Sequence, residues 1–119
     1  AVEIPRSDDG HYYVTLTIAG QPLTFMADTG ASGVVLSKAD ARRLNIDPES
    51  LVYAGESSTA NGIVRTARVR LDSVTLGPFA DESLGAFVND GDMDGSLLGM
   101  DYLGRFAIEI ADDRMILRR

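Results

Sequence analysis

An acid interrupts the apolar stretch FMADTGASGVVLS, residues 25–37. Asp28 ends one apolar run, a hydroxyl and a glycine follow at Thr29 and Gly30, and apolar residues then resume. Aspartate is depleted in strands and costly to bury. The stretch is explained either by a strand with an ordinary turn, in which Asp28 hydrogen-bonds its own backbone, or by an acid held in a partly dry loop. In the second case Gly30 permits a backbone conformation that other residues resist.

The size and composition of the chain suit one domain. It has 119 residues, of which 45% are hydrophobic. No apolar run reaches the about 18 residues of a membrane helix, so we expect membrane contact only through a segment absent from this chain. The chain begins at Ala1 rather than Met, which we interpret as a processed or trimmed form.

Charge and residue content exclude several classes of function. The formal net charge is −7, which argues against a nucleic-acid partner. The absence of cysteine excludes disulfides, thiolate metal sites and a cysteine nucleophile. The single histidine, His11, excludes multi-histidine metal sites. It lies in the polar segment RSDDGH, so we expect it on the surface at a strand edge rather than in a catalytic triad.

The first part of the chain has a pattern typical of β-structure. Residues 1–10 are predicted to form an extended, partly disordered lead. Apolar and polar residues alternate over 11–27, which predicts a β-hairpin that turns at GQP, residues 20–22. The segment VVL, residues 34–36, predicts a short third strand.

A helix and a projecting hairpin are predicted next. Ser37, with Asp40 three residues later, has the spacing of a helix N-cap, and we expect the helix to run through Leu44. Residues 51–76 contain an Asn-Gly dipeptide at 61–62, the strongest hairpin signal in the chain, between two β-prone arms. We therefore predict a long hairpin with its tip at this dipeptide.

The last part of the chain contains further strands. The pattern predicts a turn at 77–78, a strand at 83–88, a polar loop at 89–95, a segment leading into a short helix at 96–106, and a hairpin over 106–118 that turns at 111–113. The sequence thus predicts a mostly β domain, small and closed into a barrel-like shape, with one or two short helices.

A second glycine element, LLG at 97–99, lies far downstream of Asp28, with the predicted hairpin between them. An apolar strand into Asp-Thr-Gly, a hairpin and an apolar-apolar-Gly element in this order resemble the retropepsin-like aspartic proteases over residues 11–118. The stretches HYYVTLTIAGQPLTFMADTGASGVVLSKADARRL and SLLGMDYLGRF are similar to the bacterial branch of that family, whose members are often membrane-anchored and face the periplasm. The resemblance implies the acid-protease fold with a flap hairpin, one domain over 11–119 after the lead 1–10, and a periplasmic, membrane-anchored full-length protein.

The resemblance also implies a reaction. Peptide hydrolysis in this family uses two carboxylates that share one proton, because two like charges so close together do not both ionise easily. One acts as general base on a water, and the other as acid on the carbonyl oxygen. The chain has one Asp-Thr-Gly, so a homodimer would supply the second carboxylate from another copy of Asp28. The implied activity is that of an aspartic endopeptidase, which needs neither metal nor cofactor because the nucleophile is water.

The resemblance assigns roles to individual residues. Asp28 would be the catalytic acid and base, Thr29 would hydrogen-bond across the dimer axis, and the amide of Gly30 would face the inner carboxylate oxygen. The residues that would pack beneath this loop are Leu97, Leu98 and Gly99. The flap tip, which would close over a protein or peptide substrate bound in extended form, comprises Thr59, Ala60, Asn61, Gly62 and Ile63. Candidate pocket residues, each explained at least as well as core, are Val34, Val35, Tyr53, Ile63 and Phe87.

Other interpretations remain open. Residues 90–101, DGDMDGSLLGMD, place acids and a glycine at the spacings of a calcium loop, although the twelfth position is Asp and only one such loop occurs. A protease fold that binds peptides without catalysis is a second alternative. Phosphate chemistry at Asp-x-Gly would need a large α/β core, which a short β-rich chain does not provide.

Overall fold

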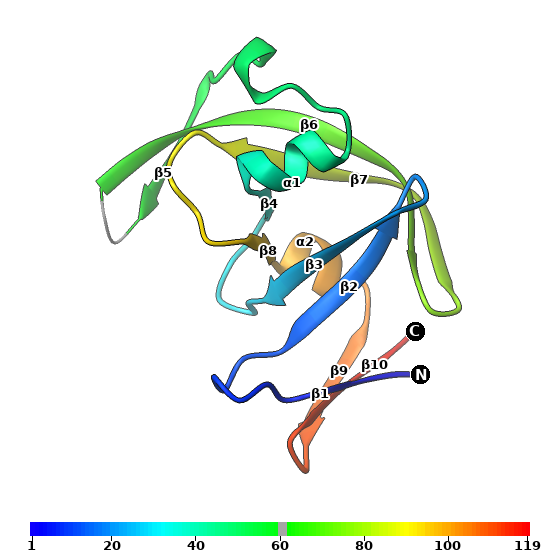
Figure 1. Cartoon of the computed structure of the whole chain (residues 1–119). Coiled ribbons are helices and arrows are strands. Elements are labelled where there is room, and N and C mark those ends of the chain that lie inside the picture. The colour runs from blue at the N-terminus through cyan, green and yellow to red at the C-terminus, as the bar shows by residue number, and fades with distance from the viewer. Residues whose placement is uncertain (60–61) are drawn as a thin grey trace.

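The computed structural model describes residues 1–59 and 62–119, and it consists mainly of strands (Figure 1). The strands are β1 (Val2–Pro5), β2 (Tyr13–Ile18), β3 (Gln21–Ala27), β4 (Val34–Leu36), β5 (Gly55–Thr59), β6 (Gly62–Leu76), β7 (Phe79–Asn89), β8 (Ser96–Leu98), β9 (Ala107–Ala111) and β10 (Arg114–Arg118). The helices are α1 (Lys38–Arg43), α2 (Met100–Leu103) and the 3₁₀ helix η1 (Pro48–Ser50). None of the helices in the described ranges has the length and apolar character needed to cross a membrane.

Six strands close into a barrel. They run in the order β2-β3-β8-β4-β7-β6, and a pairing between β2 and β6, at Thr17 with Thr75, closes the ring. Among the described strands, β5 pairs with β6 alone and stands outside the ring (Figure 1). The predicted mostly β, closed domain with two short helices is confirmed.

Alternation along the strands fills the barrel with apolar side chains. Val14, Leu16 and Ile18 on β2 are at most 2% exposed, whereas the residues between them are exposed or half-buried. Helix α2 adds Tyr102 and Leu103, which are both fully buried. Burial of one large apolar side chain stabilises a fold by about 1.5–3 kcal/mol. The interior of the barrel therefore supplies the driving force that closes the sheet.

The first hairpin forms as predicted, but its turn lies earlier than 20–22. Ala19 and Gly20 both have positive φ and make the two-residue connection that suits the twist of the strands. Pro22 lies inside β3, opposite Thr17. This pair is next to the hydrogen-bonded pair that closes the turn, so it is a non-hydrogen-bonded pair, and the missing N–H of proline costs no bond with β2. We predicted the turn too late in the sequence because proline usually occupies turns.

Helix α1 begins at the predicted N-cap. Oγ of Ser37 accepts a hydrogen bond from the Asp40 N–H at 3.1 Å, and Leu44 is the C-cap. The reciprocal contact of a capping box runs through a third residue, because Ser96 Oγ accepts from the Ser37 N–H at 3.0 Å and donates to Asp40 Oδ2 at 2.6 Å. Ser96 is 1% exposed and begins β8, so the network ties the start of the helix to a barrel strand.

The long predicted hairpin is confirmed, but its arms are unequal. β5 has 5 residues and β6 has 15. From Thr66 onward β6 pairs with β7, so only the earlier part of the hairpin projects from the barrel (Figure 1). We call residues 55–59 and 62–64 the flap arm. Thr59 pairs with Gly62, and the predicted tip residues Ala60 and Asn61 lie outside the described residues.

The N-terminal lead is ordered, so its predicted disorder is wrong. β1 pairs antiparallel with β10, and Ile4, opposite Met115, is only 6% exposed. β9 and β10 form the predicted C-terminal hairpin, which turns at Asp112 and Asp113 with positive φ at both. The three strands make a second sheet, and the two ends of the chain lie close together (Figure 1). Local pattern did not reveal β1 because its partner strand lies at the other end of the sequence.

A charged cluster joins the C-terminal end to β7. Arg119 donates to both carboxylate oxygens of Asp81, at 3.1 and 2.6 Å, and Arg105 lies 3.2 Å from the same carboxylate. The hydrogen bond from Arg119 holds the pKa of Asp81 below its usual value, although desolvation acts in the opposite direction. The Arg119 guanidinium also lies 4.3 Å from the ring centre of Phe106. The cluster fastens Arg119 to the body of the domain.

Replacing Asp81 by Asn should destabilise the protein most at neutral pH. Because the folded pKa is lowered, the ionised carboxylate contributes stability above its unfolded pKa of about 4, and the contribution is lost as the pH falls through the folded value. We expect Asp81→Asn to lower the free energy of unfolding by about 1–2 kcal/mol at pH 7 and by much less at an acidic pH below the folded pKa of Asp81. Urea unfolding at both pH values measures the loss, with Asp8→Asn as the exposed control. Equal losses at the two pH values would contradict a role for the charge.

Candidate active site

Asp28 directly follows β3, where two barrel strands run parallel. β3 pairs with β8 through Ala27 and Leu98, and the Asp28 N–H donates to the Leu98 carbonyl at 3.0 Å. Phe25, three residues earlier, is fully buried, whereas Asp28 is half-buried. The apolar strand therefore fixes the backbone of Asp28 while its side chain remains accessible.

The carboxylate of Asp28 is held by its own loop. The Gly30 N–H donates to Oδ1 at 2.9 Å, and the Ala31 N–H donates to the Asp28 carbonyl at 3.1 Å. The Gly30 amide thus faces one carboxylate oxygen, the arrangement that the resemblance implies. Across residues 1–59 and 62–119, no group donates a hydrogen bond to Oδ2. That oxygen can accept a proton or a hydrogen bond from a bound molecule.

Gly30 is not required for an unusual backbone conformation, which corrects the interpretation of the sequence. The described glycines with positive φ are Gly10, Gly20, Gly62 and Gly77. A Cβ on Gly30 would instead lie 3.2 Å from Asp28 Oδ1. Glycine leaves room beside the carboxylate, since a side chain here would crowd the oxygen that the Gly30 amide holds.

The Asp28 loop packs directly against the backbone of residues 99–101. Three N–H groups at the start of α2 donate to three loop carbonyls: Gly99 to Gly33 at 3.1 Å, Met100 to Ala31 at 2.9 Å, and Asp101 to Ser32 at 2.8 Å. These bonds satisfy donors that the first turn of a helix leaves without partners. A Cβ on Gly99 would lie 2.3 Å from the Gly33 oxygen and 2.7 Å from the Ala31 oxygen, so only glycine fits.

The three predicted support residues lie on different sides of β8. Leu98 is fully buried, and Gly99 lies against the Asp28 loop. Leu97 is half-buried and lines an open groove instead. Successive residues of a strand face opposite sides, so the two leucines cannot both pack beneath the loop. Thr29, the predicted cross-dimer residue, is exposed.

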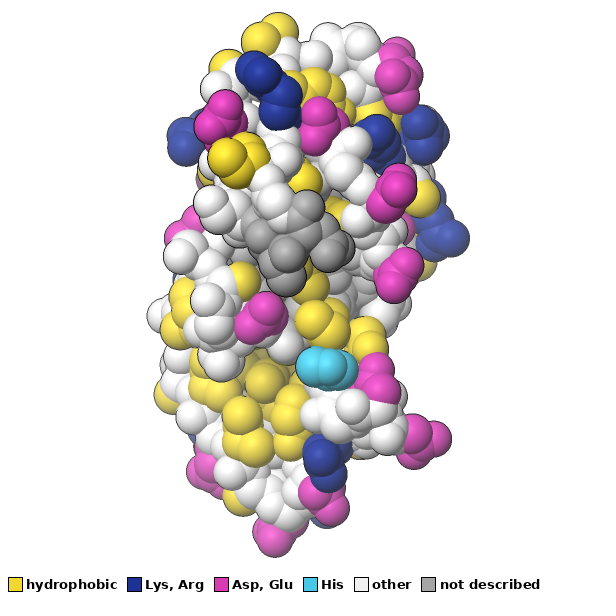
Figure 2. Space-filling view, turned by 90° about the vertical axis from the view of Figure 1, so that its left-hand side faces the viewer, with side chains coloured by type: hydrophobic (Ala, Val, Ile, Leu, Met, Phe, Trp, Pro, Cys, Tyr) yellow, Lys and Arg dark blue, Asp and Glu magenta, His cyan; other side chains and the backbone are white. Residues whose placement is uncertain are grey.

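A groove of about 890 Å³ adjoins the site. Pro22, Thr24 and Met26 on the outward face of β3 line it, and Asp28 continues the same alternation. The other lining residues are Asp9, His11, Tyr13, Asp40, Arg43 and residues 93–97. Figure 2 shows the single histidine of the chain among hydrophobic and acidic side chains on one face of the molecule. Sequence reasoning missed Met26, although alternation in LTFMA places it opposite the buried Phe25.

The remaining candidate residues are dispersed. Ile63 on the flap arm is 70% exposed, and Thr59 and Gly62 lie at the adjacent strand ends. Val34 is fully buried in the core, and Tyr53 packs against that core. Val35 and Phe87 are half-buried. The groove beside Asp28 is not lined by any of Val34, Val35, Tyr53 and Phe87.

Residues 90–101 lack the surroundings of a calcium loop. The segment 90–95 connects two strands, β7 and β8, rather than two helices, and the remaining positions lie in β8 and at the start of α2. Oδ1 of Asp90, at the first ligand position, accepts a hydrogen bond from the Arg65 N–H at 3.0 Å. No three Asp, Glu or His side chains gather into a potential metal site within the part of the chain that the structure describes. The calcium alternative therefore has no ligand set here.

The sequence matches a family model and two bacterial proteins. The model described as "gag-polyprotein putative aspartyl protease" matches residues 14–105. An uncharacterized protein of Rickettsia prowazekii (strain Madrid E) is 40% identical over 115 residues, which are 96% of this chain and 49% of that protein. An uncharacterized protein in the cobV 5′ region of Sinorhizobium sp is 35% identical over 119 residues, 98% of this chain and 51% of that protein. The chain spans about half the length of these curated relatives.

Solved structures share the fold. A retropepsin-like aspartic protease from Rickettsia conorii matches with a TM-score of 0.89 and 39% identity, over 98% of this chain and 97% of that one. The EIAV protease complexed with the inhibitor HBY-793 matches with a TM-score of 0.68 and 21% identity, over 83% and 90%. The retroviral protease-like domain of Ddi1 from Leishmania major matches with a TM-score of 0.62 and 16% identity, over 100% and 97%. The last two show similarity of fold alone.

Replacing Gly99 by Ala should displace the Asp28 loop, because the added methyl group has no room between the Gly33 and Ala31 oxygens. We expect a loss of about 1–3 kcal/mol in the free energy of unfolding, the usual cost of overpacking. Gly85→Ala is the matched control, since a Cβ there meets nothing within 4 Å and should cost less than about 0.5 kcal/mol. Urea unfolding of the parent and both variants provides the comparison. Two equally stable variants would mean that the space at Gly99 does not matter.

Proposed function

The chain belongs to the retropepsin-like aspartyl protease family, and on this premise we propose that it is an aspartic endopeptidase whose active site forms between two copies of Asp28 in a homodimer. The observation that carries the proposal is the Asp28 loop, in which an accessible carboxylate is held by the Gly30 amide and supported by Gly99. The chain has one such loop, so a second carboxylate requires a second copy.

The proposed reaction is acid–base hydrolysis of a peptide bond. One Asp28 carboxylate removes a proton from a water, whose oxygen attacks the carbonyl carbon, while the other Asp28, in its protonated form, gives its proton to the carbonyl oxygen. The carbon–nitrogen bond of the tetrahedral intermediate then breaks as one of its hydroxyl groups returns a proton to the second Asp28, while the departing amine takes up the proton that came from the water. The charge-assisted bond from the Gly30 amide would hold Oδ1 in place through these steps.

The proposed substrate is an extended segment of protein. The groove beside Asp28 has apolar side chains at Met26 and Leu97 and polar groups around them, which suits the side chains of a bound peptide. An extended peptide would also present free backbone groups to an unpaired strand edge, and in the described residues β5 has such an edge. The flap arm, which carries Thr59 and Ile63, would close over the peptide and exclude water.

A peptide-binding module with the same fold and no catalysis is the alternative function. The intact Asp-Thr-Gly sequence and the hydrogen bond from Gly30 to Asp28 favour catalysis over this alternative. Incubation with a peptide library separates the two, since a binding module would retain peptides without cleaving them.

We also propose that the full-length protein lies in the periplasm and is attached to the membrane through a segment absent from this chain. The support is the resemblance to the bacterial branch of the family. The chain corresponds to about half the length of the relatives from Rickettsia prowazekii and Sinorhizobium sp. Fractionation of cells that carry the full-length protein would test it, and recovery in the cytoplasm would contradict it.

Asp28→Asn should abolish peptide cleavage and leave the fold intact. An amide cannot act as the general base, and general acid–base catalysis alone contributes about 10²–10⁴-fold to rate. We expect kcat/KM to fall at least a thousandfold on any peptide that the parent cleaves, with the circular dichroism spectrum unchanged. Asp8→Asn, an exposed acid in the lead, makes the same change of charge and should retain full activity. Activity of Asp28→Asn within tenfold of the parent would rule out the aspartic mechanism.

A further inference from the structure

The flap arm leaves the barrel at one pair of residues. β6 and β7 pair as far as Thr66 and Asn89. Just beyond this point the Arg65 N–H donates to Asp90 Oδ1 at 3.0 Å, and the Asp90 N–H donates to the Arg65 carbonyl at 3.1 Å. Residues 62–64 then pair with β5 and not with β7. Arg65 and Asp90 therefore form the last attachment between the outgoing arm and the barrel on this side.

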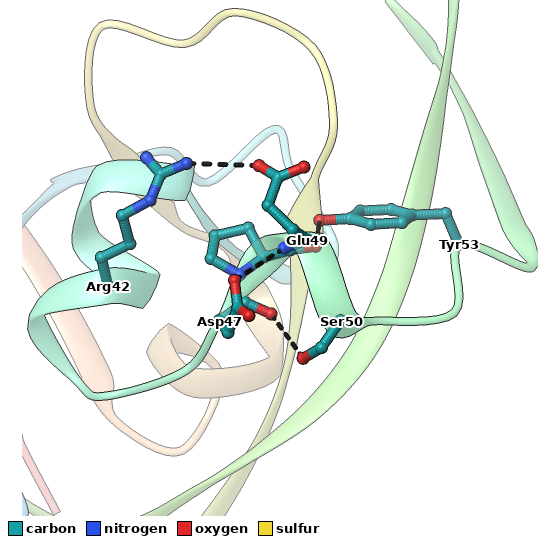
Figure 3. A network of polar contacts seen from close by, with 6 residues as sticks. Arg42, Asp47, Glu49, Ser50 and Tyr53 are labelled. Carbon is teal, nitrogen blue, oxygen red and sulfur yellow. Dashed lines mark hydrogen bonds and ion pairs between the residues drawn. The ribbon is translucent and has the colours of Figure 1, made fainter.

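The other side of the arm is attached through Tyr53. The Arg65 Nε–H donates to the Tyr53 carbonyl at 3.1 Å. The Tyr53 hydroxyl donates to the Pro48 carbonyl in η1 at 2.8 Å (Figure 3). Burial, followed by the nearby charge of Glu49, raises the pKa of Tyr53, so its hydroxyl remains a donor at neutral pH. Arg65 is thus held from two sides, by its backbone to Asp90 and by its side chain to Tyr53.

The position of η1, to which Tyr53 is bonded, is itself fixed by several polar contacts. Oδ1 of Asp47 caps its first turn by accepting from the Glu49 N–H at 3.0 Å, and the Ser50 hydroxyl donates to the Asp47 carbonyl at 2.9 Å (Figure 3). Arg42 on α1 pairs with Glu49 at 3.3 Å. The Tyr53 side of the arm is consequently fixed to the helical part of the domain, whereas the Asp90 side continues into a loop.

The loop after Asp90 forms a wall of the groove beside Asp28. Gly91 donates to Asn89 Oδ1 at 2.6 Å, and a Cβ on it would lie 3.1 Å from Val64 Cγ1 on the flap arm. Met93, Asp94 and Gly95 line the groove, and Ser96 then begins β8. The segment 90–95 therefore starts beside the flap arm, bonded to Arg65 at its base, and ends at the groove.

We propose that Asp90 is a positioning residue that couples the flap arm to the groove, so that movement of the arm and the shape of the groove wall change together. The proposal rests on the proposed protease function. When the arm moves at Arg65, the two hydrogen bonds between Arg65 and Asp90 require Asp90 to move with it, and residues 91–95, which follow Asp90, move as well. A substrate side chain that occupies the groove beside residues 93–95 favours one position of this segment and, through Asp90, the closed position of the arm. The far end of the segment stays fixed because Ser96 is bound to Asp40 and Ser37.

The test compares Asp90→Ala, Asp90→Asn and Asp92→Ala. Alanine removes the acceptor for the Arg65 N–H, asparagine keeps an oxygen there, and Asp92 is an exposed acid of the same loop that serves as control. Hydrogen exchange of the amides at 62–65 and at 91–95 is measured in the complete chain. We expect Asp90→Ala to exchange about three- to tenfold faster in both segments, the change for one lost hydrogen bond, while the other two variants match the parent.

Kinetics provide the second measurement, on a long peptide that reaches the groove and on a truncated peptide that does not. Asp90→Ala should raise KM about three- to tenfold for the long peptide with kcat nearly unchanged, and should alter the truncated peptide less than twofold. Asp90→Asn should have the parent KM, because asparagine keeps an oxygen that accepts from the Arg65 N–H. A general loss of stability in Asp90→Ala would not predict this recovery. Should Asp90→Ala fail to fold, Asp90→Leu removes the same acceptor and keeps the branched shape of the side chain.

The outcomes are distinguishable from failure of the proposed function. Faster exchange in only one of the two segments, or an equal KM change for both peptides, would overturn the coupling. If the parent cleaves no peptide at all, the protease function fails, and hydrogen exchange alone still decides whether Asp90 joins the arm to the loop.

Discussion

The backbone contact between Gly99 and the Asp28 loop is the constraint on which the candidate site depends. Three N–H groups at the start of α2 bind three loop carbonyls, and the two segments approach so closely that a single methyl group on Gly99 would collide with oxygen atoms. A loop rich in small residues has little packing of its own, so its position is set by these bonds. Asp28 is thereby fixed directly after β3 while its carboxylate remains accessible.

The pairing of strands in the barrel places Gly99 beside the Asp28 loop. β3, which leads into Asp28, lies parallel to β8, which leads into Gly99, so strands from distant parts of the sequence end side by side. The same β8 begins at Ser96, which joins Ser37 and Asp40 at the start of α1. The residues of this short strand therefore contact the Asp28 loop and a helix cap and line the groove. The segment before it, 90–95, is the one through which we propose that movement of the flap arm reaches the groove.

Much of this arrangement could be predicted from the sequence, where the signals are local. Alternation on β2, the N-cap at Ser37 and the glycine of the β6–β7 turn at Gly77 identify their elements directly. The order of the Asp-Thr-Gly loop, a hairpin and Leu97-Leu98-Gly99 identifies the family. Two predictions failed for different reasons. β1 is recognised only with β10 beside it, at the other end of the sequence. The need for glycine at position 30 comes from the side chain of Asp28, two residues away, rather than from the backbone conformation of Gly30. The attachment of Asp90 to Arg65 follows from the β6–β7 register, which no local pattern specifies.

We propose that one copy of this chain holds half of a catalytic site. Specific activity can be measured over a range of protein concentrations while sedimentation reports the fraction of dimer in the same samples. If the site forms only between two copies of Asp28, specific activity should follow the dimer fraction and vanish as the dimer dissociates. Full specific activity in samples that sediment as monomers would contradict the account, because a single Asp28 carboxylate would then be sufficient.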